Sequence, residues 1–180
     1  MEAMNVIYKQ ARIFGAEQIS RDIGWFIDNR FSLTHAIAEY KFIHCLGIED
    51  KAREQDLITQ IKVKADMLNL PQSKIIDMVQ LQFKASKIIQ CQLFSQWIEN
   101  PDSAPRSTGG IVDIEKIRSL ISSSDSALLN YLANIMVMKD DALHYMLDFH
   151  FEHPFITAAT NKEIKLSFYE IINHRYKSAL

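Results

Sequence analysis

The chain has 180 residues, of which 48% are hydrophobic, and this length is sufficient to bury a core of its own. Its formal net charge is −2, from 20 basic and 22 acidic side chains, which argues against nucleic acid as a partner because phosphate binding needs a basic surface. Apolar runs such as Ile135–Met138 are far shorter than the roughly 20 residues of a membrane-spanning helix.

Turn residues and cysteines narrow the fold class further. With only 5 Gly and 4 Pro, the composition favours helices, since barrels and sandwiches need many tight turns. Cys45 and Cys91 are too few for a disulfide framework and leave open one disulfide or two free thiols. The first fifteen residues lack the apolar stretch of a signal peptide, so no leader is expected there.

Helical periodicity begins in the first third of the chain. Apolar residues recur at helical spacing over 17–46, and Gly47 is expected to end this helix. A second helix is predicted from Asp50, a good N-cap, to the Asn69-Leu70-Pro71 segment. A third follows from about Pro71 to Trp97, because proline is tolerated in a first helical turn.

The second half of the chain has the same character. Residues 99–112 are rich in Pro, Ser and Gly and are predicted to form a loop. A fourth helix is predicted over 113–138, with further helical stretches near 140–150 and 161–178. The sequence therefore predicts one all-α domain of about six helices over 1–180, with a core at 17–138 and extra C-terminal helices at 139–180.

Polar residues at helical spacing are the candidates for function. Arg30 and Lys41 are 11 residues apart, about three helical turns plus 20°, so they share one face of the first helix. Ser86 and Gln90 share a face of the third. Asp50, Arg53 and Glu54 cluster in the first turn of the second helix. Taken singly, each is more simply explained as a solvated surface residue or as part of an interhelical polar network.

Taken in order, these residues resemble the all-α chorismate mutase family. That family has an Arg and a Lys on a long helix, then a short turn, an Asp-x-x-Arg-Glu motif, and a later Ser/Thr-x-x-x-Gln/Glu. The matching residues here are Arg30, Lys41, Asp50, Arg53, Glu54, Ser86 and Gln90.

A second motif extends the resemblance beyond the loop. Arg118-x-x-Ile121-x-x-x-Asp125 resembles the start of the family's first helix, whose Arg reaches a partner's active site in the short dimeric members. Its position after Gln90 resembles the longer exported branch, where one chain supplies the whole site. Arg106 and Lys116 are the alternatives to Arg118. The visible N-terminus lacks that branch's leader, and the two cysteines do not match its disulfide.

The resemblance implies a Claisen rearrangement of chorismate to prephenate, which needs no cofactor and no metal. Arg30 and Arg118 would bind carboxylates, Arg53 would add positive charge, and Ser86 would support a carboxylate. Lys41 and Gln90 would donate to the ether oxygen, where negative charge develops. Glu54 and Asp50 would receive the ring hydroxyl or orient neighbouring cations. Because Gln90 donates at every pH, activity should not require acid.

Several alternatives stay open at this stage. An isochorismate-pyruvate lyase shares the fold and much of the cation set, and a helical binding module could keep the fold without catalysis. A metal site at Asp148, His150, Glu152 and His153 is disfavoured by its loose spacing. The resemblance also implies a homodimer in the periplasm or outside the cell, with the cytoplasm as the alternative. The short apolar runs give no reason to expect a membrane partner.

Overall fold

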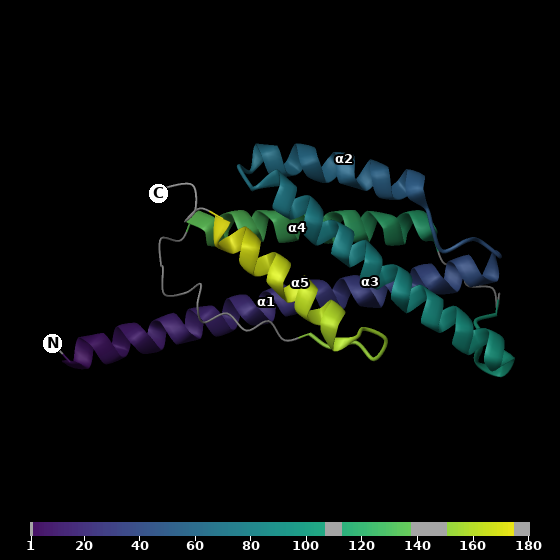
Figure 1. Cartoon of the computed structure of the whole chain (residues 1–180), viewed down its shortest axis with the longest axis horizontal. Helices are drawn as coiled ribbons and strands as arrows, with labels where there is room; N and C mark the ends of the chain where they lie inside the picture. Colours follow the sequence, from purple (N-terminus) through teal and green to yellow (C-terminus); the bar gives the residue numbers. More distant parts are fainter. Residues whose placement is uncertain (1, 107–112, 138–150, 175–180) are drawn as a thin grey trace.

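The computed structural model describes residues 2–106, 113–137 and 151–174, with side chains from residue 15 onward. These residues form helices and no strand, so the predicted all-α class is confirmed. The elements are α1 (Glu2–Ile43), α2 (Lys51–Met67), α3 (Gln72–Glu99), the short 3-10 helix η1 (Pro101–Ser103), α4 (Ile114–Val137) and α5 (Ala158–Ile172) (Figure 1).

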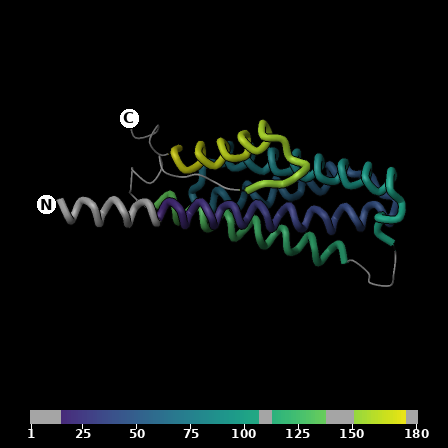
Figure 2. Tube along the Cα trace, turned by 90° about the horizontal axis from the view of Figure 1, so that it is seen from below, coloured from purple at the N-terminus to yellow at the C-terminus, as the bar shows by residue number. Residues whose placement is uncertain are grey.

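The helices α1 and α3 organise the bundle. α3 contacts α1, α2 and α5, whereas α4 packs on both α1 and α2. In Figure 2, α4 and α5 lie on opposite sides of α1, and α3 runs behind α5. Four of the helices, α1 to α4, thus surround a common interior, which α5 extends on the far side of α3.

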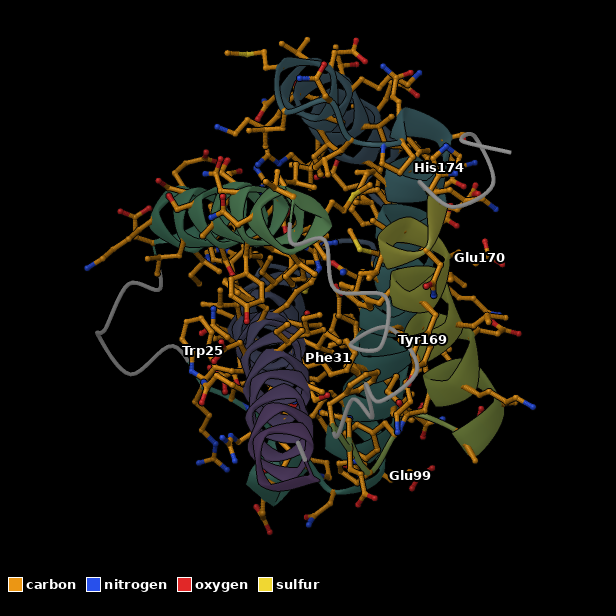
Figure 3. The ribbon with its side chains drawn as sticks, turned by 90° about the vertical axis from the view of Figure 1, so that its left-hand side faces the viewer. Trp25, Phe31, Glu99, Tyr169, Glu170 and His174 are labelled. Carbon is orange, nitrogen blue, oxygen red and sulfur yellow. The ribbon has the colours of Figure 1, made fainter. Side chains whose placement is uncertain are left out.

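The core consists of aliphatic and aromatic side chains that recur along each helix. Full burial of one such side chain contributes about 1.5–3 kcal/mol to folding. Figure 3 shows the two sides of α1, with Phe31 turned to the interior and Trp25 to the outside, where it is 61% exposed. The largest fully buried side chains outside α1 are Ile75, Met78, Ile89, Leu129, Leu132, Ile135, Ile164 and Phe168.

Both ends of α1 differ from the prediction. The helix begins at Glu2 rather than at residue 17, and it ends at Ile43 rather than at Gly47. Cys45 adopts the left-handed conformation (φ 53°), and the Leu46 amide donates to the carbonyl of Lys41 at 2.8 Å. This hydrogen bond closes a Schellman turn. The expectation that Gly47 ends the helix was wrong because Cys45 takes the position that glycine usually fills.

The other boundaries lie close to those predicted. Asp50 is the N-cap of α2, and its carboxylate accepts from the Arg53 amide at 3.1 Å. After α2, Asn69 adopts a left-handed φ of 54°. α5 starts three residues before the predicted stretch because Thr157 caps it. The predicted 140–150 helix lies outside the described residues.

Two further expectations concern the whole chain. Cys45 and Cys91 are both free and exposed, so of the two possibilities left open the structure has free thiols. Among the helices that the structure describes, none is long and apolar enough to cross a membrane.

Candidate active site

One face of α1 carries the first set of functional candidates. Arg30, Thr34, Ile37 and Lys41 follow at intervals of four, three and four residues, so they line up along the helix. Arg30 and Lys41 are only 6% and 8% exposed, and burial at this level is unusual for cations without partners. The Lys41 ammonium donates to the carbonyl of Ile48, just beyond the Schellman turn.

The turn after α1 brings Asp50 and the first turn of α2 next to Lys41. One carboxylate oxygen of Asp50 caps α2, and the other accepts from the Arg118 guanidinium of α4 at 2.8 Å. Arg53 also reaches α4, where its guanidinium donates to the Ser122 hydroxyl at 3.1 Å. The start of α2 is therefore tied to α4 by two arginines.

From α3 come Ser86 and Gln90. Thr34 of α1 donates to the Ser86 hydroxyl at 3.2 Å, which joins α1 and α3 next to the site. The Gln90 amide nitrogen donates to the backbone carbonyl of Ser86 at 3.2 Å. Its side-chain oxygen is buried without a partner among the described residues. The second N–H of the amide remains to donate to a ligand.

These side chains converge on one cavity. Its empty volume is about 700 Å³ including its open mouth, which suits a small organic ligand. All the residues predicted for the site line it, together with apolar side chains that include Phe83 and Ile121: Arg30, Lys41, Asp50, Arg53, Glu54, Ser86, Gln90 and Arg118. Of the two alternatives to Arg118, Arg106 is paired with Asp102 at 3.6 Å and largely exposed, and Lys116 is also exposed.

Most of the charged side chains that line this cavity are cationic, and the pKa of Lys41 reflects their charges. Burial lowers the pKa of Lys41. Asp50 opposes this effect and Arg118 adds to it, followed by smaller contributions of Glu54, which raises the pKa, and Lys87, which lowers it. A bound dianion would favour the charged form of Lys41, so the cavity has the electrostatics of an anion site.

Sequence reasoning assigned no role to three residues of this region. Lys87 lines the cavity and forms an ion pair with Glu54, and Thr34 lines it from α1. Asp125 of α4 forms a buried ion pair with Arg30. Helical spacing carried the signal for each: Thr34 is four residues after Arg30, Lys87 three before Gln90, and Asp125 seven after Arg118.

Metal-binding residue types are not gathered in the part of the chain that the structure describes. No three His, Cys, Asp or Glu side chains within it lie close enough to hold a metal ion. Two of the residues considered from the sequence, Asp148 and His150, lie outside that part.

Sequence comparison shows which family the first half of the chain is similar to. Residues 16–91, which include most of α1, all of α2 and most of α3, match the model of the family described as chorismate mutase type II. The resemblance inferred from the motifs is therefore confirmed over residues 16–91, which include all of its residues except those of the Arg118 motif.

Individual relatives agree with this class. The chain is 30% identical over 107 residues to a monofunctional chorismate mutase of Enterobacter agglomerans, covering 59% of this chain and 57% of that protein. It is 30% identical over 76 residues to a secreted chorismate mutase of Yersinia pestis, covering 42% and 41%. The matches thus span about half the length of these relatives.

A solved structure extends the comparison to the fold. The crystal structure of the secreted chorismate mutase from Yersinia pestis superposes with a TM-score of 0.64, over 79% of this chain and 92% of that one. Sequence identity over this match is 22%, so it establishes the shared helical fold alone.

Proposed function

We propose that this protein is a chorismate mutase that converts chorismate to prephenate. The proposal rests mainly on one observation: five cationic side chains and Gln90, from four different helices, line a single cavity. The match of residues 16–91 to the chorismate mutase type II family supports it independently. The chain forms one catalytic domain, to which α5 contributes part of the core.

The proposed mechanism needs only binding and electrostatics. In the rearrangement one C–O bond breaks while one C–C bond forms within the same molecule, so no nucleophile takes part. Arg30 and Arg118 hold the two carboxylates in the compact reactive conformer, with Arg53 and Ser86 in support. Lys41 and Gln90 donate to the ether oxygen as negative charge builds on it. Neither Lys41 nor Gln90 forms a covalent bond to the substrate, and neither transfers a proton to it.

The acidic residues have separate tasks in this mechanism. Asp50 orients Arg118 through their 2.8 Å hydrogen bond. Glu54 faces the same cavity and accepts the ring hydroxyl of the substrate. The two carboxylates also limit the repulsion among the cations before the dianion binds.

The energies involved are sufficient. Enzymes lower activation barriers by at least about 8 kcal/mol, and one donor to a developing oxyanion supplies about 2.7–4 kcal/mol. Two such donors therefore supply most of the minimum of about 8 kcal/mol, and restraint of the reactive conformer supplies the remainder.

Two rival functions remain to be separated from this one. An isochorismate-pyruvate lyase would use much of the same cation set. Purified protein offered chorismate and isochorismate in separate assays should form prephenate from the first and no salicylate from the second. Salicylate formation without prephenate would establish the rival reaction. A binding module without catalysis predicts Arg30 and Lys41 apart from Gln90 or in solvent. The burial of both cations, in a cavity that Gln90 also lines, favours the enzyme.

Location and assembly are proposed from the same resemblance. We place the protein in the periplasm or outside the cell, because the relative from Yersinia pestis is named a secreted enzyme. We also expect a homodimer in which each chain has its own site, since one chain lines the whole cavity. Light scattering of dilute and concentrated protein, with activity measured alongside, tests whether turnover is independent of dimer formation.

A further inference from the structure

Lys87 of α3 contributes a cation to the cavity that the family pattern does not include. Its ammonium lies 3.2 Å from one carboxylate oxygen of Glu54 and 3.3 Å from the other. The two side chains are 33% and 27% exposed, so the pair is sheltered but not fully buried. The contact joins α3 to the first turn of α2.

The pair lies at the boundary between two hollows. Glu54, Phe83 and Lys87 line the cavity of the candidate site, and the same three residues line a neighbouring cleft between α2 and α3. The Glu54 carboxylate can therefore turn toward either space. A bidentate contact from Lys87 restricts this choice, because it holds both carboxylate oxygens at once.

We propose that Lys87 is a positioning residue that holds the Glu54 carboxylate at the wall of the active-site cavity, ready to accept the substrate's ring hydroxyl. This inference rests on the proposed function for the identity of the substrate. Lys87 itself makes no contact with the substrate, and its effect on turnover passes through Glu54.

The charges of Lys87 and Glu54 also affect the pKa of Lys41. The charge of Glu54 raises the pKa of Lys41 and the charge of Lys87 lowers it, so the two oppose each other at that position. Two other charged groups affect the pKa of Lys41: Asp50 raises it and Arg118 lowers it. Arg30 and Arg53 line the same cavity. Removal of Lys87 leaves the Glu54 charge uncompensated and raises the pKa of Lys41.

The matched control lies one helical turn away. Lys84 lines the cleft but not the cavity, and it forms an ion pair with Glu163 of α5 at 2.9 Å. Lys84→Met and Lys87→Met therefore remove the same charge from the same helix. A general loss of attraction for a dianion would affect both variants equally, whereas loss of Glu54 positioning affects only Lys87→Met.

Kinetics provide the first test. We expect Lys87→Met to lower kcat/KM for chorismate roughly tenfold, mainly through KM, and Lys87→Arg to restore most of it. Lys84→Met should leave kcat/KM unchanged. In a Glu54→Gln background, Lys87→Met should cause no further loss. A full additional loss in that background, or equal losses in Lys84→Met and Lys87→Met, would overturn the inference.

Titration of Lys41 provides a test that does not depend on turnover. NMR of protein with 13C-labelled lysine side chains should give a higher pKa for Lys41 in Lys87→Met than in the wild type, and no change in Lys84→Met. An unchanged titration in both variants contradicts the inference even if the wild type converts chorismate. If the wild type leaves chorismate intact, the proposed function fails, and the titration still tests whether the charges of Lys87 and Glu54 act on Lys41.

Discussion

Asp50 uses its two carboxylate oxygens for different purposes. One accepts from the Arg53 amide at 3.1 Å and caps α2, and the other holds Arg118 at 2.8 Å. A residue that would ordinarily serve only as a helix cap therefore also connects two helices at the mouth of the cavity. Stability and activity should depend on different oxygens of this one side chain.

Substitution of Asp50 separates the two effects. Asn caps helices as well as Asp does, so Asp50→Asn should keep the free energy of unfolding within about 0.5 kcal/mol, whereas Asp50→Ala should lose about 1 kcal/mol. Both variants release Arg118 and should lower kcat/KM. Urea unfolding and steady-state kinetics measure the two quantities. Wild-type kcat/KM in Asp50→Asn would show that Asp50 does not orient Arg118.

Gln90 allows a prediction about pH. The amide of Gln90 donates at any pH, so wild-type kcat should vary little between about pH 5 and about pH 7.5. Gln90→Glu keeps the shape but loses the donor at neutral pH, and its kcat should fall about 100- to 1,000-fold there and recover toward acid. The pH profiles of the two proteins provide the measurement. A steep fall in wild-type activity over this range would contradict the role given to Gln90.

The family resemblance predicted eight residues that line the cavity, but neither Thr34 and Lys87 nor the pairing of these side chains. Arg30 and Lys41 could be placed on one face because α-helical geometry is regular. The contact of Arg30 with Asp125 could not, because it joins residues 95 apart through the packing of α1 on α4. Their roles in catalysis stay predictions until variants are measured.

At the scale of elements, helix interiors and most helix ends were predictable, but the two ends of α1 were not. Periodicity located α2, α3 and α4 to within a few residues because apolar spacing extends over many turns. The end of α1 depended on a single left-handed residue, and Cys45 takes that conformation in place of Gly47. Sequence favours glycine there, but the Schellman hydrogen bonds from Cys45 and Leu46 compensate for the cost in cysteine.

The segment that precedes α5 packs on α1 through a pair of histidines. Nε2 of His153 lies 3.0 Å from Nε2 of His35, and the Phe155 amide donates to Nδ1 of His153 at 3.3 Å. Since Nδ1 accepts, the proton of neutral His153 is on Nε2 and is donated to His35. Protonation of His153 would place a proton on Nδ1 and remove the acceptor of Phe155.

This contact should weaken in acid. Burial lowers the pKa of His153, and the neighbouring His35 lowers it further. As the pH falls, His153 therefore takes up a proton in the unfolded chain before it does so in the folded chain. The free energy of unfolding should fall as the pH drops below about 6.5 toward the lowered pKa. Urea unfolding at pH 7.5 and 5.5 should show a smaller decrease for His153→Phe, which keeps a ring but cannot titrate. Equal decreases in both proteins would contradict the assignment.

At the scale of the whole molecule, a buried ion pair connects α1 and α4, the first and the last of the helices that line the cavity. Arg30 of α1 and Asp125 of α4 have side chains only 7% and 9% exposed. Within the described part of the chain, Nε of Arg30 and Oδ2 of Asp125 have no hydrogen-bond partner. The pair thus joins α1 to α4 while one polar atom of each side chain stays without a partner in the described residues.

Breaking this pair should destabilise the whole bundle. Arg30→Met leaves Asp125 buried without its partner and should lower the free energy of unfolding by about 3–5 kcal/mol. Replacing both residues, as Arg30→Met with Asp125→Leu, should recover most of that loss because no buried charge remains. Chemical denaturation of the two variants and the wild type provides the comparison. If the double variant is as unstable as Arg30→Met, the ion pair does not explain the loss.

Turnover of chorismate by the wild type and by Lys41→Ala tests most directly the claim that buried donors in this cavity drive the rearrangement. The wild type should consume chorismate and form prephenate, and Lys41→Ala should have a kcat at least about 100-fold lower with an unchanged fold by circular dichroism. Absence of turnover by the wild type, or equal turnover by both proteins, would contradict it.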